Sequence, residues 1–476
     1  MTTLKKVLEL RTVVSTSSGM ALATSCYLAG IQVATIVAGE LAWISILVAG
    51  FFCLLSSMCF SELTSLYPSA AGIKLFIQNA FNEKAAIAIG SFYVILGISM
   101  VGAESYLLSS VLSSTYTIIS PSADKYIWMM IFIVLIGFIN YRGVLLTGLV
   151  QDILTYVMLG FLAAVSLYTL STHEIAISAA LASPQFTFAN VMKAAGVGVF
   201  LYVGYEWVSP LAEETTDYRL IGKGMMIAIG LLSIVYSLFV VAMYAGLTKE
   251  QLMSGTPIPH ILYGRNLFGS TGIFLFVVMS ILASVTSFNA GLLNTSRFIY
   301  AMARDNVIPR VFSKLHPDYA TPWVAILALM AFAIVLSLLI LLTGKYLFII
   351  VMAAALECII YVVMALCVLR LRKRYPDAER SFKIPFGKVI PVVTIVVFSG
   401  LTLGVFTDVS RDYSGRILFP NYLVALVMAA FAIFTTLYTL YVVPVFKKKA
   451  AVKAAARVRR RPGKPERKVS DAPDNA

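Results

Sequence analysis

The sequence predicts an all-α membrane protein with about twelve transmembrane helices. Two observations lead to this fold class. Hydrophobic residues make up 59% of the 476-residue chain and charged residues only 13%, whereas ordinary soluble domains are roughly 45–50% apolar and about 25% charged. Apolar runs of about twenty residues, each long enough to cross about 30 Å of hydrocarbon, recur from Val13 to Val443.

These apolar runs give the expected helices in order. The first is too long and too polar for the apolar region of a signal peptide, so we expect it to be retained as a helix. Residues 12–371 would hold the first ten helices and residues 390–444 the last two. The expected bounds are 12–36, 41–66, 85–113, 125–141, 147–170, 191–212, 221–247, 270–303, 322–343, 345–371, 390–409 and 419–444.

The distribution of Lys and Arg predicts that both chain ends are cytoplasmic. With the N-terminus inside, the inner loops and termini carry 29 of the 37 Lys and Arg residues, Arg297 near the inner end of the eighth helix makes 30, and the outer loops carry seven. Cytoplasmic loops are enriched in these residues. We therefore expect a multi-pass protein of the cell membrane, with a cytoplasmic N-terminus at 1–11 and a basic cytoplasmic tail at 445–476.

The formal net charge of +14 does not indicate a nucleic-acid partner, because much of it lies in the tail. Eleven Lys and Arg residues fall between Lys447 and Lys468, after the last apolar segment. Such a tail is attracted to anionic lipid headgroups at roughly 1 kcal/mol per basic residue. The five cysteines have no C-x-x-C spacing and the three histidines are scattered, so we expect no disulfide framework and no metal site.

The first and sixth helices are unlike ordinary spanning helices. The first reads VVSTSSGMALATSCYLAG and the sixth reads AAGVGVFLYVGYEWVSPLAEE. Lipid cannot satisfy bare backbone groups, so interrupted helices persist only where they are buried or line a cavity. Two interruptions five helices apart indicate an inverted repeat with a substrate site between its halves. The alternative is that the small residues only allow close helix packing.

Four carboxylates fall within or beside the predicted spans, namely Glu104, Asp152, Glu206 and Glu357. Each costs about 2.5–3.5 kcal/mol at a helix centre, so each needs a partner, a proton or a water-filled cavity. Glu206 lies in the interrupted sixth helix, which favours a functional role. For Glu104 and Glu357, structural pairing and a transport role are equally open. Asp152 lies near a helix end, where we expect a solvated or capping role.

Aromatic and hydroxyl side chains provide further candidates. Tyr202, on the interrupted stretch, is placed to close over a ligand as a lid. In the eighth helix, hydroxyls and an amide would hold Na⁺ or a substrate group, or would hydrogen-bond to another helix. These residues are Ser284, Thr286, Ser287 and Asn289.

Four segments resemble those of the amino acid–polyamine–organocation family of permeases. The stretch FLYVGYEWVSPLAEETTDYRLIGKG resembles its sixth helix and following loop, and Asn289–Trp323 resembles its eighth helix and cytoplasmic loop. Phe60–Ile73 and Glu379–Pro391 are also similar to family segments. The resemblance implies a five-plus-five inverted-repeat core with discontinuous helices 1 and 6, two additional helices and alternating access, in a monomer or a homodimer.

The resemblance also implies a site. In the family, backbone amides of helix 1 hold a substrate carboxylate and backbone carbonyls of helix 6 hold its amine. The matching positions here are Ala23, Thr24 and Ser25 in helix 1, and Tyr202, Val203 and Gly204 in helix 6. Glu206 matches a glutamate used for gating or protonation in some members.

Two departures from the family bear on substrate and coupling. Members usually carry Gly-Ser-Gly where this chain has Ala23-Thr24-Ser25, and those that use a lysine in helix 5 for proton coupling have it near Met158. The lost glycines, together with Glu104 and Glu357, favour an alternative substrate, a cationic amine or polyamine. Such a ligand needs acids more than it needs a carboxylate cradle.

The leading hypothesis is a secondary transporter of an amino acid, coupled to protons or to exchange. The alternatives are a cationic amine or polyamine transporter or exchanger and a nutrient sensor that binds without transport. No motif of a catalytic or cofactor site is present, so we expect no enzyme and no cofactor beyond H⁺ or Na⁺ as coupling ion. The expected substrate-binding residues are Ala23, Thr24, Ser25, Glu104, Tyr202, Val203, Gly204 and Ser287; Tyr202, Glu206 and Glu357 are the expected gating or proton-carrying residues.

Overall fold

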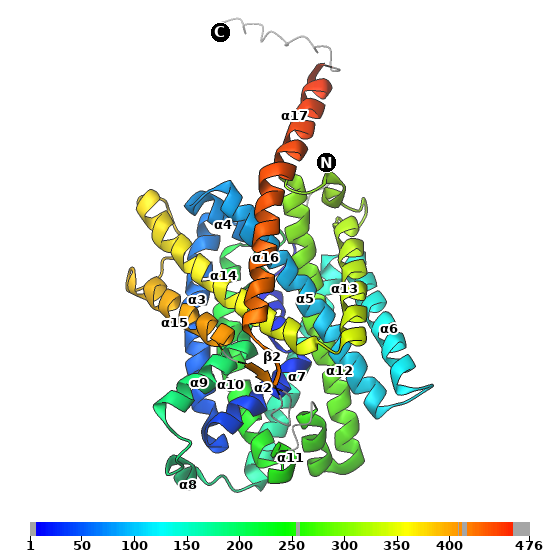
Figure 1. Cartoon of the computed structure of the whole chain (residues 1–476), viewed down its shortest axis with the longest axis vertical. Coiled ribbons are helices and arrows are strands. Elements are labelled where there is room, and N and C mark those ends of the chain that lie inside the picture. The colour runs from blue at the N-terminus through cyan, green and yellow to red at the C-terminus, as the bar shows by residue number, and fades with distance from the viewer. Residues whose placement is uncertain (1–5, 254–257, 408, 412–416, 460–476) are drawn as a thin grey trace, which may run out of the picture.

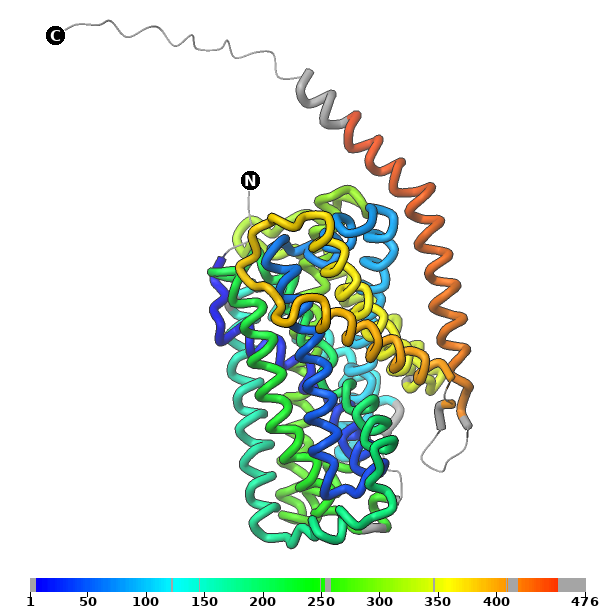
Figure 2. Tube along the Cα trace, turned by 90° about the vertical axis from the view of Figure 1, so that its left-hand side faces the viewer, coloured from blue at the N-terminus to red at the C-terminus, as the bar shows by residue number. Residues whose placement is uncertain are grey.

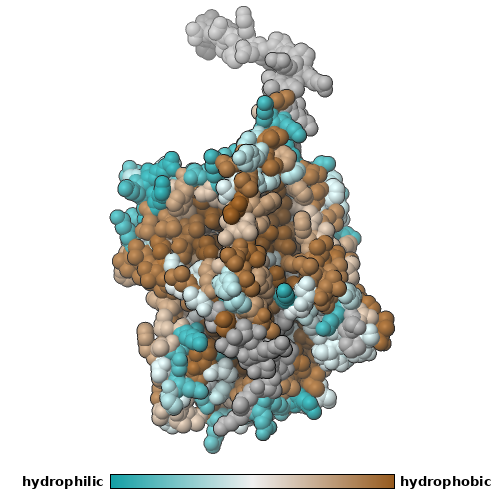
Figure 3. All heavy atoms as spheres, viewed as in Figure 1, coloured by the Kyte–Doolittle hydropathy of each residue, from teal (hydrophilic) through white to brown (hydrophobic). Residues whose placement is uncertain are grey.

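The computed structural model describes residues 6–253, 258–407, 409–411 and 417–459. Within these residues, eleven helices are long and apolar enough to cross a membrane, and the bent pair α1 and α2 makes a possible twelfth span. The predicted all-α membrane fold with about twelve spans is therefore confirmed. On the face that Figure 3 shows, apolar side chains form a broad belt, and many of the polar groups gather toward the two ends.

The spanning elements follow the predicted order (Figure 1). They are α1 Leu10–Ala21 with α2 Thr24–Ile36, α3 Ala42–Leu66, α5 Glu83–Thr115, α6 Pro121–Arg142, α7 Val144–Thr172, α9 Phe188–Gly198 with η2 Val199–Tyr202 and η3 Tyr205–Glu213, α10 Arg219–Ala245, α12 Pro259–Arg304, α13 Trp323–Thr343, α14 Tyr346–Arg374, α15 Val389–Thr407, and α16 Tyr422–Leu437 continued by the π-helical η5 Tyr438–Val442 and by α17 Val443–Arg459.

Short elements connect these spans. The helical ones are η1 Gly39–Leu41, α4 Gly72–Ala80, α8 Ile177–Leu181, α11 Lys249–Met253 and η4 Arg310–Ser313. Between α15 and α16 a small antiparallel hairpin forms from β1 Val409–Arg411 and β2 Ile417–Pro420. The hairpin was not predicted from the sequence.

Figure 2 shows that α1 begins, and α17 ends, at the same end of the bundle. A chain that crosses the membrane an even number of times has both of its ends on the same side, so this arrangement agrees with twelve spans. At the centre, α1 packs against α10 and α12, and α3 packs against both α9 and α10. The two interrupted helices thus lie inside the bundle, where other helices cover their backbone. The internal symmetry of a five-plus-five repeat stays a prediction.

Helix 1 is interrupted at Leu22 and Ala23, where α1 and α2 meet at an angle of 63°. The sequence predicted this interruption. Ala23 has an extended backbone conformation, with φ −95° and ψ 154°, and so separates the two helical halves.

Helix 6 is interrupted at Val203 and Gly204, as predicted, with 3₁₀ segments on both sides. Gly204 has φ 108°, a region that residues with a Cβ rarely adopt. A Cβ at this position would also lie 2.3 Å from Cγ of Met20. The two interruptions therefore contact each other, and glycine is required at the contact.

The predicted end of the last helix was wrong. The last helix does not end at 444 but continues through η5 and α17 to Arg459, because the segment after Lys449 is rich in alanine and other strong helix formers. Part of the predicted tail is thus helical, and residues 460–476 lie outside the described residues. The predicted start of the eighth helix at 270 is confirmed: non-helical backbone at Phe268 and Gly269 separates the long piece, which follows Gly269 and ends at Arg304, from a shorter helical piece that begins at Pro259.

Replacing Gly204 with alanine should destabilise the protein by about 1–3 kcal/mol, because it combines an unfavourable backbone conformation with a clash against Met20. Thermal unfolding of the purified protein measures the effect. Gly230→Ala is the matched control, since Gly230 is in α10 and a Cβ there meets nothing within 4 Å. The control should be neutral or slightly stabilising. Equal losses in both variants would contradict the special role of Gly204.

Candidate functional site

A cavity of about 940 Å³ runs from the face opposite the chain ends to the two helix interruptions. Its outer part is lined by Lys125 and Lys193, at the starts of α6 and α9, and by Thr407 at the end of α15. Its inner end is lined by Thr24 and Ser25 of helix 1, with Val203 of helix 6 nearby in the lining. The cavity therefore joins one face of the membrane to the expected site.

The carbonyl groups left free where α1 ends have side-chain partners. The Tyr236 hydroxyl donates to the Ala21 carbonyl at 2.7 Å, and the Ser287 hydroxyl donates to the Met20 carbonyl at 3.1 Å. Tyr236 belongs to α10 and Ser287 to α12, so side chains of two neighbouring helices stabilise the backbone at the interruption. Ser287, predicted to bind substrate, has this structural contact instead of a place in the cavity lining.

The N–H groups where α2 begins face a carboxylate. The Thr24 N–H donates to Oε2 of Glu104 at 3.3 Å, and the Ser25 hydroxyl donates to Oε1 at 3.0 Å. The Ser284 hydroxyl of α12 donates to Oε2 at 3.2 Å. Glu104 is buried, at 2% exposure. Glu104 thus lies at the position where the resemblance places a substrate carboxylate.

The polar residues predicted on the eighth helix divide into two groups. Ser284 faces helix 1, where its hydroxyl lies 2.8 Å from that of Thr24. Asn289 faces the other way and donates to Gln151 of α7 at 2.8 Å, while accepting from Asn140 of α6 at 2.8 Å. The Thr286 hydroxyl donates to a carbonyl of its own helix. These four residues do not form a common site.

Tyr202 points away from the cavity. Its hydroxyl donates to the Ile46 carbonyl of α3 at 2.9 Å and lies 3.0 Å from that of Ser233 in α10. The residue is fully buried. The role of Tyr202 as a lid stays a prediction, and in this structure the side chain anchors helix 6 to its neighbours.

Glu206 of η3 and Glu357 of α14 lie close together. The Tyr361 hydroxyl of α14 donates to Glu206 at 2.9 Å, and Glu357, one turn earlier on α14, lies close to both Glu206 and Trp207 without a hydrogen bond to either. Both acids are fully buried, and within the described residues neither forms an ion pair with a basic side chain. Sequence reasoning missed Tyr361, although its spacing of four residues from Glu357 places both on one helix face.

The expectation of a solvated or capping Asp152 was wrong. Its side chain is 6% exposed and accepts from Arg11 at 2.8 Å and from Thr12 at 3.0 Å; the Ser15 hydroxyl also donates to it. Asp152 lies on α7, and its three partners lie on or beside the first turn of α1. The carboxylate therefore fixes the start of helix 1 to helix 5.

Ion pairs close the end of the bundle near the chain ends. Arg297 of α12 and Glu214, after η3, are both buried and pair at 2.9 Å. Arg304 pairs with Glu213 at 2.8 Å, and Glu213 also accepts from Ser69. Further pairs link Lys74 with Asp305 and Lys447 with Glu83. This end is therefore held shut by contacts among α4, α12 and the end of helix 6.

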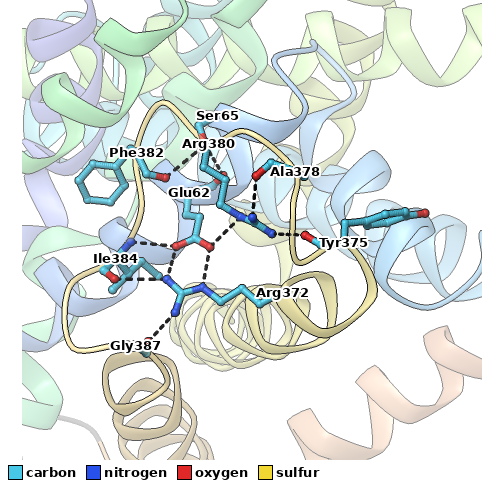
Figure 4. Close-up of polar contacts among 9 residues, drawn as sticks. All are labelled: Glu62, Ser65, Arg372, Tyr375, Ala378, Arg380, Phe382, Ile384 and Gly387. Carbon is cyan, nitrogen blue, oxygen red and sulfur yellow. Dashed lines mark hydrogen bonds and ion pairs between the residues drawn. The ribbon is translucent and has the colours of Figure 1, made fainter.

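A second cluster of contacts at the closed end surrounds Glu62 of α3 (Figure 4). Glu62 pairs with Arg372 of α14 at 2.7 and 2.5 Å and with Arg380 at 3.3 Å, and it accepts the Ile384 N–H at 2.9 Å. Arg372 also donates to the Gly387 carbonyl at 2.7 Å. The Glu62 carboxylate thus holds the loop between α14 and α15 against the C-terminal end of α3.

Comparison with known proteins matches this architecture to a family. The family described as "Amino acid permease" matches residues 8–453, nearly the whole described chain. The chain belongs to the amino acid permease family. The resemblance seen in the sequence is therefore confirmed, and the permease occupies the membrane with its broken helices 1 and 6 at the inner end of the cavity.

Several relatives of the permease have named substrates. A branched-chain amino acid permease of Bacillus subtilis (strain 168) is 24% identical over 408 residues, covering 79% of this chain and 83% of the relative. A methylthioribose transporter of the same organism is 22% identical over 405 residues, with the same coverage. The large neutral amino acids transporter small subunit 2 of Homo sapiens is 23% identical over 378 residues, covering 76% of this chain and 68% of the relative.

Replacing Glu62 with glutamine should release the loop between α14 and α15, because both arginines lose their ionised partner. Limited digestion with trypsin, which cleaves after Arg380 and Lys383, should become severalfold faster. Glu379→Gln is the matched control, since Glu379 is an exposed acid on the same loop. Unchanged digestion of Glu62→Gln would show that other contacts hold the loop.

Proposed function

We propose that the permease is a secondary transporter that moves a small amino compound, an amino acid or an amine, by alternating access. One observation carries the proposal. The cavity reaches both broken helices from one face, while ion-paired side chains close the other face. This asymmetry is the geometry of one end state of alternating access, with the binding site at the helix breaks.

We place the substrate where the cavity meets Thr24, Ser25 and Val203. Helix breaks in transporters present backbone N–H and carbonyl groups to the charged ends of such compounds. The relatives are named for branched-chain amino acids, large neutral amino acids and methylthioribose. Their names thus differ in substrate, so that of this chain must be argued from its own residues.

Coupling to protons is proposed to involve Glu206 together with Glu357. Two neighbouring acids buried without a basic partner repel each other when both are ionised, so at least one of them should hold a proton. Glu206 directly follows the break in helix 6, and Glu357 lies on α14. Movement of these helices would change the distance between the two acids and therefore their affinity for a proton.

The proposed setting is the cell membrane, with both chain ends in the cytoplasm. The bias of Lys and Arg supports this orientation. The cavity would then open outward, and the closed end with Glu62 and Arg297 would face the cytoplasm. Because the whole cavity is lined by one chain, a monomer would suffice for transport.

Counterflow in proteoliposomes tests transport without assuming a coupling ion. Vesicles are loaded with an unlabelled amino acid or amine, and uptake of the labelled compound is followed. We expect transient accumulation that protein-free vesicles lack. Ligand-dependent thermal stabilisation without any accumulation would favour a nutrient sensor and overturn the proposal.

Glu206→Gln should leave a folded protein whose transport is lost or no longer depends on pH, because the variant cannot carry a proton. Glu357→Gln should have the same effect, since the two acids act as a pair. The measurement is initial uptake over a range of external pH. Glu174→Gln, at an exposed position outside the membrane spans, is the control. Unchanged pH dependence in Glu206→Gln would remove Glu206 as the proton carrier.

A further inference from the structure

We propose that Glu104 takes the place of a substrate carboxylate at the helix 1 break, and that the permease therefore selects amines that lack an α-carboxylate. The inference rests on the proposed transport function and names the class of compound transported. Glu104 would then be the residue that determines specificity.

The hydrogen bonds at the break support this assignment. Both oxygens of Glu104 are engaged, one by the Ser25 hydroxyl and the other by the Thr24 N–H and the Ser284 hydroxyl. The backbone amide of Ser25 also lies near the carboxylate. The donors at the start of α2 that would suit an anion are thus already used by a side chain of α5. A ligand carboxylate could bind there only by displacing Glu104.

Glu104 also sets the charge at the inner end of the cavity. Within the described residues it forms no ion pair, and all its hydrogen-bond donors are neutral groups. Two of those donors, Thr24 and Ser25, line the cavity. A buried acid without a cation is costly in the membrane, at about 2.5–3.5 kcal/mol, and an ammonium group beside Thr24 and Ser25 would offset that cost.

The other residues that line the cavity also suit an amine. Its walls are mainly aliphatic, with Leu28, Val111, Ile350 and Val351 among the lining residues, and so suit the hydrocarbon part of an amine. The lining includes two cations, Lys125 and Lys193, at the starts of α6 and α9 near the solvent-facing end. Solvent screens them over about 8 Å at physiological salt, so they do not set the charge at the inner end.

The test compares amino acids with the amines that their decarboxylation yields. Ligand-induced thermal stabilisation of the purified full chain is measured with leucine and isoamylamine. Counterflow is measured with lysine and cadaverine, with protein-free vesicles as the reference. The wild type should be stabilised by isoamylamine and exchange cadaverine, with responses to leucine and lysine about tenfold or more weaker.

Three variants of Glu104 separate charge from packing. Glu104→Gln keeps the size and loses the charge, so its affinity for amines should fall by about tenfold or more. Glu104→Ala frees the Thr24 N–H and should gain affinity for leucine and lysine. Glu104→Asp keeps the carboxylate and should keep the preference for amines, which a purely structural role in folding would not predict.

The outcomes separate this inference from the proposed function. Exchange of lysine but not cadaverine by the wild type, with the same preference in Glu104→Gln, would support transport and overturn the inference. Stabilisation by isoamylamine that depends on Glu104, without counterflow of either compound, would support the inference and overturn transport. Absence of both stabilisation and counterflow would count against both.

Discussion

The structure depends on how backbone groups are satisfied where two helices break inside a membrane. A broken helix leaves N–H and carbonyl groups without partners, and lipid offers none. Here Tyr236 and Ser287 donate to the carbonyls at the end of α1, and Glu104 accepts from the N–H at the start of α2. These partners come from α10, α12 and α5. The break in helix 1 therefore fixes the relative positions of three other helices.

The second break depends on the first. Gly204 has a backbone conformation that favours glycine and lies directly against Met20 in the last turn of α1. The Tyr202 hydroxyl ties the same stretch to α3 and α10. The break in helix 6 therefore lies directly against the break in helix 1. The inner end of the cavity, between Thr24 and Val203, follows from this contact.

Charge is distributed unequally along the axis of the bundle. The end near the chain termini holds ion pairs centred on Glu62, Glu213 and Glu214, whereas the acids deeper in the bundle, Glu104, Glu206 and Glu357, have no basic partner among the described residues. Paired charges stabilise closure, and unpaired acids remain available to a proton or a cationic ligand. This difference in pairing links the closed end to the proposed site.

The sequence alone determined the fold class, the approximate number of spans and the two interrupted helices, because hydrophobic length and clusters of small and polar residues are local properties. It also pointed to Glu104, Glu206 and Glu357, since acids in apolar segments stand out. It could not assign their partners. Only the tertiary structure placed Glu104 on the Thr24 N–H and brought Glu357 beside Glu206.

The same reason explains what the sequence missed or placed wrongly. The roles of Tyr361, Arg297 and Glu62 depend on residues between 83 and 322 positions away, and the burial of Asp152 depends on the start of α1. The separations between Arg297 and Glu214 and between Glu62 and Arg372, for example, are 83 and 310 residues. Hydrophobic patterns identify which segments enter the membrane, but helix packing decides which polar groups meet there, and that packing depends on the whole chain.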